Sequence, residues 1–104
     1  MKRIFDAAFA ATNAQTGNHP SHIGRLWWVE GSQTGSWTPA EAHDYVVAHP
    51  DTAYVSEGSS TVYVKPYHRR DNPTHRWVQT QPDGVREDNL VTLAKRHTAG
   101  LPNR

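Results

Sequence analysis

Cysteine is absent from the 104-residue chain, which excludes disulfide bonds, thiolate metal sites and cysteine nucleophiles. Long apolar runs are absent too: none approaches the roughly 18 residues that a membrane-spanning helix needs, so we expect no membrane partner. Apolar residues make up only 36% of the chain, and the mean hydropathy is -0.79. A chain of this length and composition is expected to form one domain with a small core, built mainly from aromatic rings and valine.

An excess of charge of either sign is also missing. The chain has 11 basic and 10 acidic side chains, a formal net charge of +1, and seven histidines. A near-neutral protein is not expected to bind nucleic acid with its whole surface, so such binding would need a local patch. The first residues resemble a secretory signal, but Asp6 interrupts the apolar stretch that such a signal requires. We therefore expect a cytoplasmic protein.

Known catalytic motifs are missing as well. The sequence has no phosphate-binding glycine loop, no G-x-S-x-G motif and no H-E-x-x-H motif. Asp83, Glu87 and Asp88 cluster near Asn89 in a pattern that fits catalytic acids. The same residue types more often form tight turns by bonding their own backbone, which is the interpretation that we prefer. We expect a protein that is not an enzyme, without catalytic residues or a cofactor.

Four histidines are the candidates for a metal site. His19 and His22 are three residues apart, and His68 and His75 flank a basic loop. Imidazoles bind zinc when the fold brings three or four of them together. Their spacing matches no zinc motif, so we prefer solvated histidines and expect no metal site. A metal-dependent hydrolase remains as a third hypothesis.

Local patterns predict two helices. Residues 2–14 place Phe5 and Phe9 on one stripe at helical spacing, which predicts a short N-terminal helix, joined by a linker that ends at residue 21. The clearest signal is Thr38-Pro39-Ala40-Glu41, in which a capping threonine precedes proline and is followed three residues later by glutamate. It predicts a helix over residues 39–49.

The remaining apolar segments alternate with polar residues, as strands do. The predicted strands span residues 22–30, 52–56, 61–67 and 76–81, with a last short strand or turn over 85–93. Consecutive strands with short turns favour an antiparallel sheet. We therefore expect an α+β domain over residues 22–93, with four to five antiparallel strands and the 39–49 helix packed across them. Residues 94–104 are expected to form a flexible tail.

Three stretches carry a recognisable pattern: I-G-R-L-W-W-V at 23–29, A-Y-V-S-E-G-S-S-T-V-Y-V at 53–64, and P-D-G-V-R-E-D-N-L-V-T-L at 82–93. They resemble a family of small, functionally uncharacterised domains of bacteria and their viruses, with the patterns I-x-x-V-R-W, A-Y-V-x-D-G-x-S-x-V-x-V and A-D-G-x-x-x-D-N-L-x-x-L. Trp27 and Pro82 depart from it, where the family has Arg and Ala. The resemblance implies an intact domain over about residues 22–93 and no particular activity. The arginine-rich composition is typical of a GC-rich bacterium or its phage.

Two neighbouring tryptophans indicate an interface. Trp27 and Trp28 in one strand must point to opposite faces, so one helix cannot cover both rings. The second ring needs cover from the N-terminal helix, through Phe5 and Phe9, or from another molecule.

A basic and aromatic segment is the other candidate surface. Its cations and rings are Lys65, Tyr67, Arg69, Arg70, Arg76 and Trp77. This composition suits phosphate neutralisation with base stacking, and it also suits a protein interface or an ordinary solvated hairpin.

We predict a non-enzymatic, phage-encoded binding module that contacts a host protein or a second copy of itself. The predicted interface residues are Phe5, Phe9, Trp27, Trp28, Trp37, Arg69 and Arg70. The alternative hypothesis is nucleic-acid binding through residues 65–77.

Overall fold

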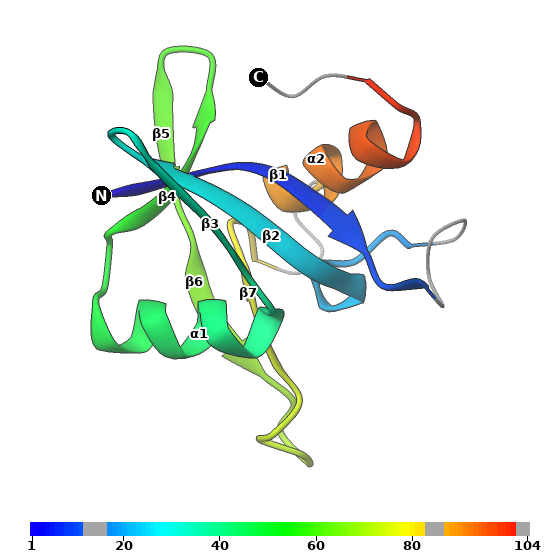
Figure 1. The fold of residues 1–104 in the computed structure, drawn as a ribbon. Helices are drawn as coiled ribbons and strands as arrows, with labels where there is room; N and C mark the ends of the chain where they lie inside the picture. Colours follow the sequence, from blue (N-terminus) through cyan, green and yellow to red (C-terminus); the bar gives the residue numbers. More distant parts are fainter. Residues whose placement is uncertain (12–16, 83–86, 102–104) are drawn as a thin grey trace.

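The structure is a computed structural model that describes residues 1–11, 17–82 and 87–101. Its elements follow the order β1 (Lys2–Phe9), η2 (Pro20–His22), β2 (Ile23–Glu30), β3 (Gln33–Trp37), α1 (Pro39–Ala48), β4 (Ala53–Glu57), β5 (Ser60–Tyr63), β6 (Lys65–His68), β7 (Arg76–Gln79) and α2 (Asn89–Thr98) (Figure 1). The α+β class is confirmed. Neither α1 nor α2 has the length and apolar surface that crossing a membrane would require.

The main sheet has five strands in the order β3-β2-β1-β4-β5, and β6 and β7 form a separate two-stranded sheet. β1 runs parallel to β4, while every other pair is antiparallel. The prediction of a wholly antiparallel sheet is therefore wrong. The reason is the crossover through α1, which carries the chain from β3 back to the far side of β1.

The predicted N-terminal helix is also wrong, because Lys2–Phe9 is the central strand of the sheet. A register shift between Ile4 and Asp6 inserts Phe5 as an extra residue opposite β2. This bulge places Ile4 and Ala7, three residues apart, on the same buried face, which imitates helical spacing. Lys2–Phe9 is consequently part of the domain, and residues 12–14 of the predicted helix lie outside the described residues.

Helix α1 begins as the sequence predicts. The backbone N–H of Glu41 donates to Thr38 Oγ1 at 3.2 Å, and Glu41 Oε1 accepts from the Thr38 N–H at 2.8 Å. Both bonds satisfy groups that the first helical turn leaves unpaired. Ala42 and Val46 are buried on its inner stripe, and the helix contacts β2, β3, β6 and β7.

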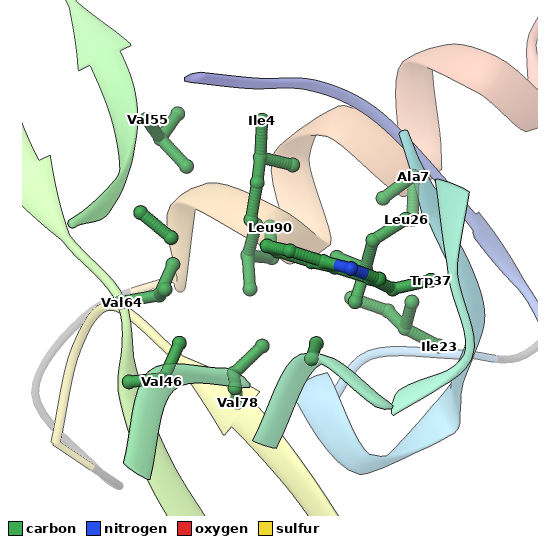
Figure 2. Packing of buried hydrophobic residues seen from close by; sticks show 13 residues of the cluster. Ile4, Ala7, Ile23, Leu26, Trp37, Val46, Val55, Val64, Val78 and Leu90 are labelled. Atoms are coloured by element: carbon green, nitrogen blue, oxygen red, sulfur yellow. The ribbon is translucent and has the colours of Figure 1, made fainter. Parts of the chain in front are cut away.

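A cluster of mostly aliphatic side chains forms the core around the ring of Trp37 (Figure 2). Ile4 and Leu26 contribute from the sheet, and Val46 and Val78 from α1 and β7. Leu90, in the first turn of α2, joins the same cluster, so both helices help to close the core. Burial of each such side chain stabilises the fold by roughly 1.5–3 kcal/mol.

Helix α2 replaces the short strand or turn that was predicted to end at residue 93 and the tail that was predicted to follow it. Leu90, Val91 and Ala94 are buried at helical spacing. β1 pairs with β4 only at Lys2 and Arg3, and α2 packs against β1. The tail prediction is therefore wrong through residue 98, while residues 85–86 and 102–104 lie outside the described residues.

The predicted strand 61–67 is divided at Val64. Its first part, β5, pairs with β4, and its second part, β6, pairs with β7. Val64 is fully buried between them and donates its N–H to the carbonyl of Ala53 at 3.0 Å. Gln33–Trp37 forms β3, a strand that the sequence patterns described above do not predict.

Candidate functional site

One face of the five-stranded sheet is turned away from the core cluster; α2 covers part of it at Trp27 and Asp6, and we call the whole face the open face. Its residues alternate along each strand with buried ones such as Ile4, Leu26 and Val55. The strand pairing places one residue from each strand in a row across it. That row consists of Thr34, Val29, Arg3, Tyr54 and Tyr63. The other open-face residues used below are Arg25, Trp27, Ser36, Ser56 and Thr61.

The two arginines of the open face have no carboxylate partner among the described residues. Arg25 Nη1 donates to the hydroxyl of Ser36 at 2.9 Å, and Arg3 makes no ion pair within the described ranges. Tyr54 and Tyr63 face each other across β4 and β5, and Tyr63 is 36% exposed. The open face therefore combines uncompensated positive charge with adjacent aromatic rings.

Trp27 is covered from within the chain. Its indole stacks on the imidazole of His97, with ring centroids 5.5 Å apart and an interplanar angle of 12°. His97 lies in the last turn of α2, and its Nδ1 is 3.1 Å from Asp6 Oδ2. The cover that the sequence required for this ring therefore comes from α2 and not from an N-terminal helix.

Trp28 lies on the opposite side of β2, as the alternation predicts. Its ring centroid is 5.9 Å from that of Trp37 and 4.1 Å from Lys2 Nζ. Lys2 Nζ also bonds Glu30 Oε1 at 2.8 Å. This bond, with a second from the N-terminal ammonium group, lowers the pKa of Glu30 to about 2. Trp37 itself is buried in the core, where it cannot touch a partner directly.

The phenylalanines predicted as interface residues, Phe5 and Phe9, lie on β1. Phe5 occupies the bulge, and Phe9 packs against the core. Both rings are half-buried. Because His97 covers Trp27, no outside molecule is needed to shelter the second tryptophan. The predicted protein interface at these residues stays a prediction.

Most cations of the segment 65–77 are paired with carboxylates. Arg76 forms two bonds of 2.8 Å with the Asp44 carboxylate, and Arg69 bonds both oxygens of Asp71 at 2.9–3.0 Å. Lys65 bonds Asp51. The arginines hold the pKa values of Asp44 and Asp71 below the ordinary range. Arg70 is the segment's one cation with no such partner among the described residues.

The rings of this segment are less available than the sequence suggests. Trp77 is only 9% exposed, and its indole N–H donates to Gln79 Oε1 at 2.8 Å. Its ring centroid lies 6.0 Å from His19 and 5.3 Å from His75. Tyr67 is half-buried. Within the described ranges, no group of three His, Asp or Glu side chains is placed to hold a metal ion.

Asp88 has a structural role at the start of α2. One carboxylate oxygen accepts from the N–H of Leu90 at 2.9 Å. The other accepts from the N–H groups of Thr80 and Gln81 at 2.7 and 2.9 Å. Asn89 bonds the side chains of the same two residues. These bonds join α2 to the end of β7, while Asp83 lies outside the described residues.

The outer edge of β5 is a second notable surface. The bond from the Val64 N–H to the Ala53 carbonyl shows which residue pairs of β4 and β5 are hydrogen-bonded pairs. Because bonded and non-bonded pairs alternate, Ser60 and Val62 bond β4, while the N–H and C=O groups of Thr61 and Tyr63 point outward. No charged residue or proline occurs in Ser60–Tyr63.

Sequence reasoning found parts of the open face but not the whole. Alternation in the strands placed Arg25 beside Trp27, and it placed Tyr54 and Tyr63 away from the buried valines. The place of Arg3 on this face could not be inferred, because the sequence pattern predicts a helix over residues 2–14. The signal available in the sequence is the alternation of the charged Arg3 with the apolar Ile4, which a strand also explains.

Comparison with protein-family models, curated proteins and solved structures gave no match. The resemblance to a family of bacterial and viral domains therefore stays a prediction.

Proposed function

We propose that the protein is a non-enzymatic binding module that associates with a second copy of itself through β5. The observation that carries this proposal is the outward-pointing backbone of Thr61 and Tyr63 on an edge without charge or proline. Such an edge is a template for another strand, since its donors and acceptors match those of any extended chain. The β4–β5 hairpin also projects from the body of the protein, which leaves room for a partner (Figure 1).

A second copy of β5 fits this edge with a defined register. In antiparallel pairing centred on Val62, Thr61 faces Tyr63 of the partner subunit, and every outward group of the strand is bonded. The other sheet edge, β3, is less suitable, because Arg25 reaches across to Ser36 and places a positive charge beside it. A charge at a sheet edge disfavours pairing with a second copy.

The test is the molar mass in solution, measured by light scattering and sedimentation over a wide concentration range. We expect the mass to rise from 11.7 kDa toward twice that value as the concentration increases. Thr61→Pro removes an outward N–H without breaking a bond to β4. Each dimer then loses this bond in both copies, roughly 1 kcal/mol apiece, so the dissociation constant should rise about 30-fold.

The matched control is Thr34→Pro on β3. The two-residue turn Gly31–Ser32 leaves the Thr34 N–H pointing outward in the same way. This variant should keep the wild-type mass profile. A protein that stays monomeric at every concentration, or a dimer that Thr34→Pro disrupts and Thr61→Pro does not, would overturn the proposal.

The competing occupant of this edge is an extended segment of a host protein. It predicts a monomer in isolation and a complex of unequal chains in host extract, which the mass of the purified protein separates from self-association. The alternative hypothesis, nucleic-acid binding by residues 65–77, is weakened because Lys65, Arg69 and Arg76 are paired with carboxylates.

A further inference from the structure

We infer that the open face binds single-stranded nucleic acid, with Tyr54 and Tyr63 stacking on bases and Arg3 and Arg25 contacting phosphates. Thr61 and Tyr63 belong to both proposed surfaces, but this site uses their side chains on the open face, whereas self-association uses their backbone groups at the β5 edge. Binding here therefore does not depend on self-association. The site also differs from the hairpin segment 65–77.

The tyrosine pair provides the stacking surface. Tyr54 and Tyr63 are directly opposite each other in a non-hydrogen-bonded pair, the arrangement in which facing side chains lie closest. Tyr63 is 36% exposed, and its side chain lies on the open face of the sheet, so a base can approach its ring from that face even when the β5 backbone pairs with a second copy. An aromatic ring on a sheet accepts any base, because every base has a π-face.

The phosphate contacts follow from the register. Arg3 is the neighbour of Tyr54 in the parallel β1–β4 pair, and strands in a sheet are about 4.8 Å apart. The Arg3 guanidinium is therefore within reach of the backbone of a nucleotide whose base stacks on Tyr54. Arg25 lies farther along β2, beyond the stacked Trp27–His97 pair, and provides a second positive charge beside Ser36.

Charge complementarity favours an anionic ligand on this face. The carboxylate of Asp6, on the adjacent part of β1, already contacts His97 and accepts the N–H of Ala7. Hydroxyl groups of Ser56 and Thr61 flank the tyrosines and can bond phosphate or base edges. The segment 65–77 has more cations than the open face, but three of these cations are paired with carboxylates.

The shape of the face selects single strands. Stacked and paired bases in a duplex do not present their π-faces to a protein surface, whereas unpaired bases do. We therefore expect a 12-nucleotide single strand to bind at least 10-fold more tightly than the matching duplex at the same salt concentration.

The experiment is fluorescence anisotropy of a labelled 12-nucleotide oligothymidylate at about 50 mM salt, repeated as the salt concentration rises. Two phosphate contacts per chain predict a slope of log K against log salt near -1.4, and Arg3→Gln should reduce its magnitude by about 0.7. Tyr63→Ala should weaken binding about 5-fold or more, and Tyr63→Phe should restore it, because the ring and not the hydroxyl is needed.

The matched control is the Arg69→Gln/Arg70→Gln double variant of the hairpin, which should bind as the wild type does. Circular dichroism and thermal unfolding verify that each variant is folded. Absence of binding at low salt, equal binding of duplex, or binding that the hairpin variant loses and Tyr63→Ala retains would each overturn the inference. Binding of an acidic protein in place of the oligonucleotide would overturn it as well.

Discussion

The imidazole of His97 stacks on the indole of Trp27 at a centroid distance of 5.5 Å, although the two residues are 70 positions apart in the sequence, one in the last turn of α2 and the other in the middle of β2. The contact packs the last turn of α2 against β1 and β2, which carry Asp6 and Trp27. It also explains how a strand with large rings on both faces is covered within one chain.

We expect His97→Ala to lower the free energy of unfolding by about 1 kcal/mol, since a stacked aromatic pair contributes roughly 0.5–1.5 kcal/mol. The emission of Trp27 should shift to longer wavelength as its ring becomes solvated. His68→Ala, on the exposed hairpin, is the control and should change neither quantity. Equal effects of the two substitutions would contradict the role of the His97 stack.

Asp88→Ala is expected to destabilise the protein by about 2–4 kcal/mol. The substitution removes the cap of α2 and leaves the N–H groups of Thr80 and Gln81 without their acceptor. Chemical denaturation measures this change. As the control, the free energy of unfolding of Asp71→Ala, a change at an exposed residue, should stay within about 0.5 kcal/mol of the wild-type value. A comparable loss in both variants would argue against the structural role of the Asp88 hydrogen bonds.

Stability should fall in acid as Glu30 becomes protonated. Its pKa is about 2 in the folded protein against an ordinary value of 4.5, so its contribution is complete above about pH 4.5 and is lost toward pH 2. The lowered pKa values of Asp44, Asp71 and Glu87 act in the same direction. Urea midpoints measured from pH 6 to pH 2 test this, and Glu30→Gln should flatten the curve. An unchanged slope in that variant would contradict the assignment.

Gly35→Ala should also destabilise the fold, by about 1–3 kcal/mol. A Cβ atom at this position would lie 2.5 Å from Cζ2 of Trp28, which would have to leave its place beside Trp37 and Lys2. Thermal unfolding measures the loss. Ser36→Ala, at the next residue of the same strand, is the control, and equal stability of both variants would show that Trp28 has room to move.

Elements with a local signal could be predicted from the sequence. Helix α1 follows from the Thr38-Pro39-Glu41 cap, because the bonds that start it join residues three apart. The β4–β5 turn follows from Gly58, which adopts a φ of +60°. The opposite orientation of Trp27 and Trp28 follows from strand alternation alone.

Elements that depend on partners distant in the sequence could not be predicted from it. β1 carries alanines that favour a helix, but pairing with strands on both sides outweighs that local preference. Its bulge then changes the spacing of Ile4 and Ala7, so the apolar pattern indicates the wrong element. The open face has the same origin: the β4–β5 hairpin joins Tyr54 to Tyr63 locally, but Arg3 becomes their neighbour only through the parallel β1–β4 pair.

Amide hydrogen exchange at the β5 edge tests the central claim most directly. The N–H groups of Thr61 and Tyr63 point away from β4, so in a monomer they exchange quickly, whereas that of Val62 is protected. Self-association predicts that protection at Thr61 and Tyr63 increases with protein concentration, while the outward amide of Thr34 on β3 stays unprotected. Fast exchange at Thr61 and Tyr63 at every concentration would contradict the account.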